Sequence, residues 1–366
     1  MSGAFVIAAR RSAVMPVGGA FAGLEVHALA GPVMRACLAD AGIAAAQVDE
    51  VILSNALGAG GNPARVAALA AGLPEHVAGL SIDRQCAGGL DAVILARAMV
   101  ESGAAEVVLA GGAESYSRRP LRLRTDPAGG AAVAYDAPPF TPWDAGGWGQ
   151  ERGMHAAAAA LAERLGISRA AQDAFAIASH ARARATHQPE IVEIEGVLRD
   201  GFTRDLTSAL AARAKRVAGS IAAANAAIAA DGAAFCLVVS ERIAMQATRA
   251  LRIVAGATLG ADPQEPGLAP LGAIARVLSL SLAPGMALER SEIMEAYAVQ
   301  AIACIQGAGL DAARVNMAGG ALARGHPVGA SGAVLVARLF ADLQQGYGLC
   351  AIAAAGGIGS ALVLKA

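Results

Sequence analysis

Gly325-His-Pro-Val-Gly-Ala-Ser-Gly332 is the stretch that decides the fold, because a glycine-rich turn here precedes an apolar helix and then the pair Gly356-Gly357. The same arrangement occurs earlier, where Cys86-Ala-Gly-Gly89 precedes an apolar helix and a strand ending at Gly111-Gly112. The two spacings, Gly88 to Gly111 and Gly332 to Gly356, are 23 and 24 residues. This match predicts a duplicated five-layer α/β/α/β/α core, with Cys86 and His326 at equivalent helix N-termini.

Short apolar runs alternate with helical patterns on the N-terminal side of this core. The pattern predicts strands over 5–9, 48–55 and 106–110 and helices over 26–41 and 63–71. Such alternation is typical of parallel sheets with helices on both faces. Residues 116–218 differ in composition, with a cluster of arginines and a Gly/Pro/Trp stretch, but they keep an apolar periodicity. They are therefore expected to form an inserted loop domain. The predicted units are therefore 1–115 with 219–248, 116–218, and 249–366.

Composition excludes several classes of protein. Of 366 residues, 55% are hydrophobic and 16% charged, against roughly 45–50% and about 25% in an average soluble domain, so disorder is excluded. The net charge of -1 shows no excess of positive charge that would favour binding to nucleic acid or to an anionic membrane. Residues 347–364 carry no charge, but their central Gly-Gly-Ile-Gly favours a turn between two buried strands over a spanning helix.

The cysteines favour a reducing, cytoplasmic setting. There are five, an odd number that does not suit a disulfide framework, and their spacing matches no metal site. The N-terminal apolar run is too short for the hydrophobic core of a signal peptide, so no export signal is expected.

Cys86 and His326 are the candidate catalytic residues. A cysteine at a strand-to-helix turn faces backbone N–H groups, and the helix dipole favours its thiolate. The flanking glycines would let an acyl carbonyl approach those donors. His326 is the histidine that lies in a glycine-flanked turn, and it could accept the thiol proton. The alternatives are that Cys86 is a buried packing residue and His326 a surface turn residue, but together they favour acyl chemistry.

These segments resemble the thiolase family of acyl-CoA:acetyl-CoA C-acyltransferases over nearly the whole chain. The resemblance rests on ordered motifs, namely 6–11, 61–65, Arg84-Gln-Cys-Ala-Gly-Gly89, Gly111-Gly-Ala-Glu-Ser115, 167–179, Asn225 with 231–234, and Asn316–Gly332. It implies the thiolase fold, with Cys86 carrying the acyl group and His326 activating it. It also implies an oxyanion hole made by the backbone N–H groups of Cys86 and Ala355.

Two positions depart from the family pattern. The family Asn-Glu-Ala-Phe-Ala is Met294-Glu-Ala-Tyr-Ala298 here, so Met294 replaces the asparagine that holds a water in the oxyanion hole. The family Cys-Ile-Gly-Gly-Gly-Met-Gly is Ala353-Ala-Ala-Gly-Gly-Ile-Gly359, so Ala353 replaces the acid/base cysteine. Cys350 is three residues away, and on a strand it would point to the opposite face.

Coenzyme A is the expected ligand, and it enters as a thioester substrate, with no separate cofactor and no metal. The resemblance places the inserted loop domain over coenzyme A, with Met154, Arg213, Arg216 and Ala227 at the binding site. Coenzyme A is anionic, and the same domain supplies further cations in Arg118, Arg119 and Lys215. An ordinary solvated face is the alternative interpretation of the arginines. The family also implies a homodimer or homotetramer.

The predicted function is a thiolase-like acyltransferase of the acetyl-CoA acetyltransferase or 3-ketoacyl-CoA thiolase type, acting on acyl-CoA, with condensation or thiolysis impaired by the two departures. One alternative is an acyl-CoA hydrolase, or an acyltransferase to a non-carbon acceptor. The other is a non-catalytic thiolase-fold binding subunit, which would have no need for Cys86 and His326.

Overall fold

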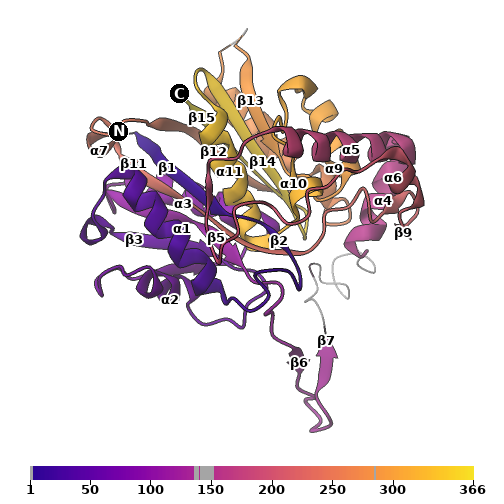
Figure 1. Cartoon of the computed structure of the whole chain (residues 1–366), viewed down its shortest axis with the longest axis horizontal. Helices are drawn as coiled ribbons and strands as arrows, with labels where there is room; N and C mark the ends of the chain where they lie inside the picture. The colour runs from indigo at the N-terminus through magenta and orange to yellow at the C-terminus, as the bar shows by residue number, and fades with distance from the viewer. Residues whose placement is uncertain (1–2, 136–139, 141–151, 284–285) are drawn as a thin grey trace.

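The computed structural model of the chain describes residues 3–135, 140, 152–283 and 286–366. An eleven-stranded sheet runs through the described residues (Figure 1). Its main path consists of two groups of strands. The N-terminal group is β4 (Leu80–Ile82), β3 (Glu50–Ser54), β5 (Val107–Glu114), β11 (Ala230–Ser240) and β1 (Ala4–Ser12). The C-terminal group is β12 (Leu251–Gly260), β15 (Ile358–Lys365), β14 (Tyr347–Ala354) and β13 (Leu288–Ile293).

The two groups repeat one topology. β1, β11, β5 and β3 lie side by side, and the first two pairs are antiparallel while the third is parallel. β12, β15, β14 and β13 have the same order and the same senses. The groups join where β1 and β12 pair over just two positions, Phe5 with Arg252 and Val6 with Leu251. This repeat agrees with the predicted duplication.

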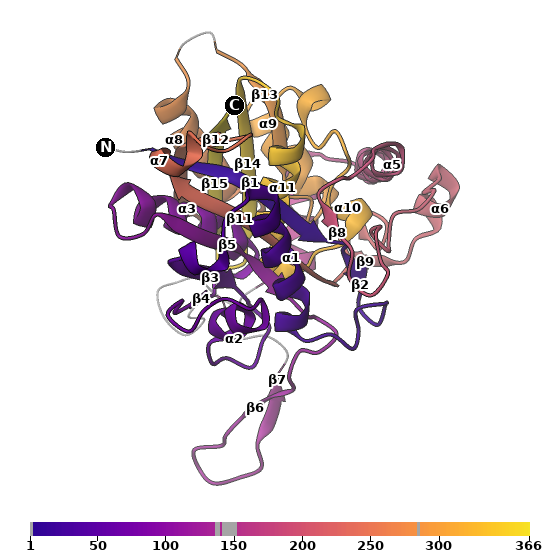
Figure 2. The same cartoon turned by 60° about the vertical axis from the view of Figure 1, so that its left-hand side comes forward.

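Helices separate and cover the two groups, which makes five layers (Figure 2). The central layer is α3 (Gly88–Glu101) and α11 (Ser331–Asp342), which share one core cluster with strands of both groups. α1 (Val26–Ala41) and α2 (Pro63–Ala70) pack on the outer face of the N-terminal group. α8 (Pro270–Ser281) and α9 (Ala298–Gly307) pack on the outer face of the C-terminal group. The α/β/α/β/α prediction is confirmed.

Side-chain alternation explains how each strand serves two layers. On β11, Cys236 and Val238 join the central cluster, whereas Leu237 and Val239 join the outer one. α11 is buried at every position from 331 to 339, as expected of a helix enclosed on all sides. A core built mostly from Ala, Val, Leu and Ile lets these layers approach closely.

Two expectations need correction. The sheets are mixed rather than parallel, because β5 is followed by the inserted residues and β14 by a tight turn, neither of which is a crossover helix. The two glycine pairs are also not equivalent. Gly111-Gly112 lies inside β5, whereas Gly356-Gly357 forms the turn between β14 and β15 with φ of 81° and 71°. The duplication rests on the topology instead.

The β14–β15 hairpin occupies the uncharged segment 347–364, so the strand interpretation of that segment is correct. No helix among the described residues has the length and apolarity needed to cross a membrane.

The predicted inserted region contains helices that pack on the C-terminal half. It includes β6 (Arg122–Arg124) and β7 (Val133–Tyr135), which project from the body in Figure 1, as well as α4 (Met154–Leu165), α5 (Arg169–Ala185), β8 (Ile191–Val192), α6 (Ser208–Arg213) and β9 (Arg216–Ala218). The remaining short elements are β2 (Met15–Pro16), β10 (Ile221–Ala222), α7 (Glu241–Ala244) and α10 (Ala321–Arg324). α4 and α9 share an apolar cluster that includes Leu161 and Val299. The domain boundaries stay a prediction.

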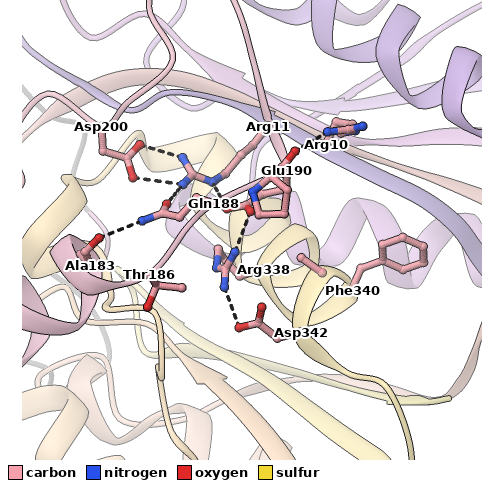
Figure 3. A network of polar contacts seen from close by, with 12 residues as sticks. Arg10, Arg11, Ala183, Thr186, Gln188, Glu190, Asp200, Arg338, Phe340 and Asp342 are labelled. Carbon is pink, nitrogen blue, oxygen red and sulfur yellow. Dashed lines mark hydrogen bonds and ion pairs between the residues drawn. The ribbon is translucent and has the colours of Figure 1, made fainter.

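A buried ionic network ties the inserted region to β1 and α11 (Figure 3). Arg11 on β1 binds Glu190 at 2.9 Å and Asp200 at 2.7 Å, and Arg338 on α11 binds the second oxygen of Glu190 at 2.7 Å. Arg338 also binds Asp342 one turn later on its own helix, at 2.6 Å. The side chains of Arg11 and Arg338 are wholly buried, so removing one partner would leave an uncompensated charge in the interior.

Candidate active site

Cys86 lies at a strained turn between β4 and α3. Gln85 has a φ of 49°, in the left-handed region that side chains rarely adopt, and residues 85–87 form a single 3-10 turn before the helix begins at Gly88. A Cβ at Gly88 would lie 2.0 Å from Ser54 Oγ, so this position requires glycine. The turn leaves Cys86 partly accessible.

His326 lies in the equivalent turn before α11. Gly325 has a φ of 114°, and a Cβ there would meet the Cβ of Ala230 at 2.9 Å. The backbone N–H of His326 donates to the carbonyl oxygen of Ile228 at 2.8 Å, which fixes the loop against residues 226–229. A 3-10 turn over 328–330 then connects to α11 at Ser331.

The N-termini of α3 and α11 meet through glycine. A Cβ at Gly89 would lie 2.8 Å from the backbone nitrogen of Ala333, and a Cβ at Gly332 would lie 2.2 Å from the backbone nitrogen of Leu90. This close approach brings together the two residues that the sequence singled out. His326 Nε2 lies 3.1 Å from Cys86 Sγ.

Ser331 orients the imidazole of His326. Its hydroxyl lies 2.7 Å from His326 Nδ1 and donates to the carbonyl oxygen of Pro327 at 3.2 Å. A hydroxyl has one hydrogen, so when Ser331 donates it to Pro327, its Oγ accepts from Nδ1–H and the Nε2 lone pair of His326 faces Cys86. The sequence analysis missed Ser331, although it lies in the same motif, five residues after His326.

Two buried carboxylates hold the loops of the site. Glu114 accepts from the backbone N–H groups of Ala56 and Leu57, both at 3.1 Å, and of Gly329 at 2.9 Å, and burial raises the pKa of Glu114 to about 7. It thereby joins the loop after β3 to the turn after His326. The sequence quoted Glu114 within a motif without assigning it this bracing role.

Glu295 holds the segment that precedes His326 through similar hydrogen bonds. Its carboxylate accepts from Ser179 Oγ and from Asn316 Nδ2, both at 2.7 Å, and from the backbone N–H of Leu322 at 3.2 Å. Asn316 also bridges both backbone groups of Ile293 at the end of β13, at 2.8 Å each. The conformation of residues 316–324 is therefore held by two side chains from elsewhere in the chain, Ser179 and Glu295, and by Asn316 itself.

Electrostatics place the pair in its neutral form. Burial raises the pKa of the Cys86 thiol to about 12, although the backbone N–H groups of Cys86 and Ala355 act in the opposite direction. Burial lowers the pKa of His326 to about 4. The expected preference for a thiolate is therefore wrong for the resting site, because desolvation outweighs the helix dipole. The pair is a thiol beside a neutral imidazole at pH 7.

A cavity of about 520 Å³ opens over the pair. Six of the residues predicted for the site line it, namely Cys86, Met154, Ala227, His326, Ala353 and Ala355. Arg213 and Arg216 are exposed and are absent from the described lining, while Met294 is buried in the central core cluster. Arg119, one of the cations expected over coenzyme A, also lines the cavity. Further polar side chains line it without having been predicted for it, among them Arg122, His155, Tyr297 and Gln300.

Ala353 and Cys350 lie on opposite faces of β14. Cys350 joins the central core cluster with Ile352 and is fully buried, whereas Ala353 contributes its methyl group to the cavity. The predicted alternation is confirmed, so Cys350 does not reach the site.

Sequence comparison decides the family. The sequence model of the thiolase N-terminal domain matches residues 4–242, and that of the thiolase C-terminal domain matches residues 247–366. The chain belongs to the thiolase family. This thiolase is 40% identical over 337 residues to the "Putative acetyl-CoA C-acetyltransferase YhfS" of Bacillus subtilis (strain 168), covering 87% of this chain and 88% of the relative.

Two further relatives span this thiolase completely or nearly so. It is 35% identical to an acetyl-CoA acetyltransferase of Cupriavidus necator, with 100% of both chains covered. The crystal structure of the Bacillus anthracis acetyl-CoA acetyltransferase superposes with a TM-score of 0.91 at 31% identity, covering 100% of this chain and 99% of that one. The chain therefore has the thiolase fold and is a thiolase-type acyltransferase.

Proposed function

We propose that this thiolase takes an acyl group from an acyl-CoA thioester onto Cys86. The observation that carries the proposal is the distance of 3.1 Å between Cys86 Sγ and His326 Nε2. In this step Sγ attacks the thioester carbonyl while its proton moves to Nε2, and the departing CoA sulfur then takes that proton. Because the resting thiol has a pKa of about 12, proton transfer accompanies formation of the S–C bond.

The backbone N–H groups of Cys86 and Ala355 are the proposed oxyanion donors. Both act on the Cys86 sulfur, where they lower the pKa of the thiol, so they point toward the reacting centre. The thioester carbonyl oxygen, which becomes negative in the tetrahedral intermediate, would lie beside these two N–H groups. Donors of this kind contribute about 10²–10³ in rate.

The second half of the reaction is where this site differs from the family pattern. Thiolysis of a 3-ketoacyl-CoA breaks a C–C bond and leaves an enolate that needs a proton, and condensation requires the reverse transfer. The methyl group of Ala353 can neither donate nor accept that proton. We therefore propose that C–C chemistry is slower here by about 10²–10⁴ than with an acid/base side chain at this position.

The retained half of the reaction supports a second candidate function. An acylated Cys86 can pass its acyl group to water or to another thiol or hydroxyl without any α-proton transfer, which gives an acyl-CoA hydrolase or an acyltransferase to a non-carbon acceptor. A purely binding subunit is disfavoured, because binding requires neither the Cys86–His326 contact nor the Ser331 contact that orients the imidazole.

Coenzyme A is proposed as part of the substrate, without a resident cofactor. Among the described residues no group of three His, Cys, Asp or Glu side chains is arranged to hold a metal ion. A homodimer or homotetramer and a cytoplasmic location remain proposals based on family resemblance and cysteine content.

Product analysis with purified protein tests the proposed function. Acetoacetyl-CoA with CoA would give acetyl-CoA if C–C cleavage survives, and acetyl-CoA alone would give free CoA if the protein is a hydrolase. Cys86→Ala is the control, because it removes the proposed acyl carrier. Equal CoA release by Cys86→Ala and the wild type would contradict the proposal.

A further inference from the structure

Tyr297 and His155 form a polar pair on the wall of the catalytic cavity. The Tyr297 hydroxyl lies 2.8 Å from His155 Nδ1, and the two rings meet edge to face with centroids 5.6 Å apart. Both residues line the cavity that contains Cys86 and His326. Tyr297 is 9% exposed, while His155 is exposed at the first turn of α4. The acylation step described above uses neither of them.

The backbone places this pair near the reacting residues. Tyr297 forms a β-bridge with Ala226, and His326 forms one with Ala229. The segment between them also bonds through Ala227 N–H, which donates to the carbonyl oxygen of Ala296 at 2.9 Å. Tyr297 and His326 therefore both lie against the short segment 226–229, whose residues Ala227 and Ala229 also line the cavity.

The Tyr297–His155 hydrogen bond offers a path for a proton out of the cavity. Burial, and then the charge that Cys86 would carry when ionised, raise the pKa of Tyr297, so the phenol is protonated and can donate to Nδ1 in the tautomer whose Nδ1 carries a lone pair. The other ionisable side chains of the described cavity lining are Asp83, Cys86, Tyr116, Arg119, Arg122, Glu265 and His326. Of these, Glu265 is paired with Arg164 at 2.7 Å. The imidazole of His155 is therefore the proton acceptor behind the phenol.

We propose that Tyr297 and His155 form the proton-transfer pair of the second half-reaction, in which the acyl group leaves Cys86 for an acceptor carrying an O–H group, such as water. Tyr297 is the catalytic residue that touches the acceptor, and His155 is a positioning residue that acts through it. The proposal rests on the acyl-Cys86 intermediate of the proposed function. It gives the site a group for this step that Ala353 cannot supply.

The step balances without any oxidant or reductant. The acceptor X–H bond breaks, its proton moves to the Tyr297 oxygen, and the Tyr297 proton moves to His155 Nδ1. The X–C bond forms at the acyl carbonyl as the C–S bond to Cys86 breaks. The exposed imidazole of His155 then releases one proton to solvent, and the Cys86 thiolate takes one up, which restores the resting pair.

Separate half-reactions test this role. Tyr297→Phe removes only the hydroxyl, His155→Gln removes the base, and Tyr347→Phe is the matched control because Tyr347, at the start of β14, is outside the described lining of the cavity. Acetylation by acetyl-CoA is followed by rapid-quench intact mass. The isolated acetyl-enzyme is then kept in CoA-free buffer with water as the acceptor, and loss of the acetyl mass is followed across pH 6–9.

All three variants should become acetylated by acetyl-CoA at a rate within twofold of that of the wild type. Tyr297→Phe should slow hydrolysis of the acetyl-enzyme by about 10²-fold or more at pH 7, and His155→Gln by about tenfold, whereas Tyr347→Phe should not change it. Hydrolysis by Tyr297→Phe should also rise more steeply with pH, because it depends on free hydroxide. Unchanged hydrolysis, or equal losses in both half-reactions, would overturn the proposal. Absence of an acetyl adduct on the wild type would instead overturn the proposed function, and this proposal with it.

Discussion

Replacing His326 by alanine should separate proton transfer from sulfur attack. A thiol with a pKa of about 12 is ionised in roughly one molecule in 10⁵ at pH 7, so unaided attack by the thiolate is strongly suppressed. His326 Nε2, at 3.1 Å from the sulfur, is positioned to remove this limitation. General bases contribute about 10²–10⁴ in rate, so His326→Ala should lose that factor in Cys86 acylation at pH 7.

The pH dependence gives a sharper result than the single rate. With a pKa of about 4, His326 stays a neutral base above about pH 5, so wild-type acylation should be flat between pH 5.5 and 8. The variant has no base and depends on free thiolate, so its rate should rise about tenfold per pH unit. Rapid-quench intact mass after mixing with acetyl-CoA measures both profiles, and His76→Ala is a control at an exposed histidine.

Two results would refute this reasoning. Wild-type acylation that falls below pH 6.5 would mean that the imidazole is not desolvated as the structure has it. A wild-type rate that itself rises tenfold per pH unit would mean that the thiolate forms by equilibrium with solvent and that His326 does not remove the proton.

Three further predictions follow from other parts of the structure. Ala353→Cys should raise acetoacetyl-CoA thiolysis at least tenfold in a spectrophotometric assay, because it restores an acid/base side chain on the cavity wall; an unchanged rate would show that another group limits C–C cleavage. In calorimetry, Arg119→Ala should raise the Kd for CoA about tenfold, since an ordered charged hydrogen bond contributes about 1.5–3 kcal/mol, whereas exposed Arg216→Ala should change it less than about fivefold. The reverse order would place the phosphate contacts on the surface. Glu190→Gln should lower the free energy of unfolding in urea by about 3–5 kcal/mol, because it leaves two buried guanidinium groups without their shared carboxylate; a loss below about 1 kcal/mol would mean that the network relaxes or admits water.

The sequence was most informative where short-range geometry decides the structure. The glycine-rich turns at 86–89 and 325–332 have such tight contacts that few other residues fit, so their pattern indicated helix N-termini and the approach of Cys86 to His326. The same reasoning was correct for Ala353 and Cys350, because the faces of a strand alternate with a period of two.

Contacts between distant segments could not be obtained in this way. Glu114 braces Gly329 across more than two hundred residues, and no local pattern encodes that hydrogen bond. The Tyr297–His155 pair also joins distant segments, because His155 lies on α4, so no local sequence pattern indicates their hydrogen bond. Whether a thiolate or a thiol prevails depends on burial, which the helix dipole argument did not include.

Localising an acyl adduct on the protein tests the central claim most directly. Wild-type protein would be incubated with acetyl-CoA, digested at low pH to preserve the thioester, and sequenced by tandem mass spectrometry. An acetyl group on the peptide containing Cys86, absent from Cys86→Ala, is the predicted result. An unmodified Cys86 with an acetyl group on Cys350 or any other cysteine, or no adduct together with continued turnover, would contradict acyl transfer through Cys86.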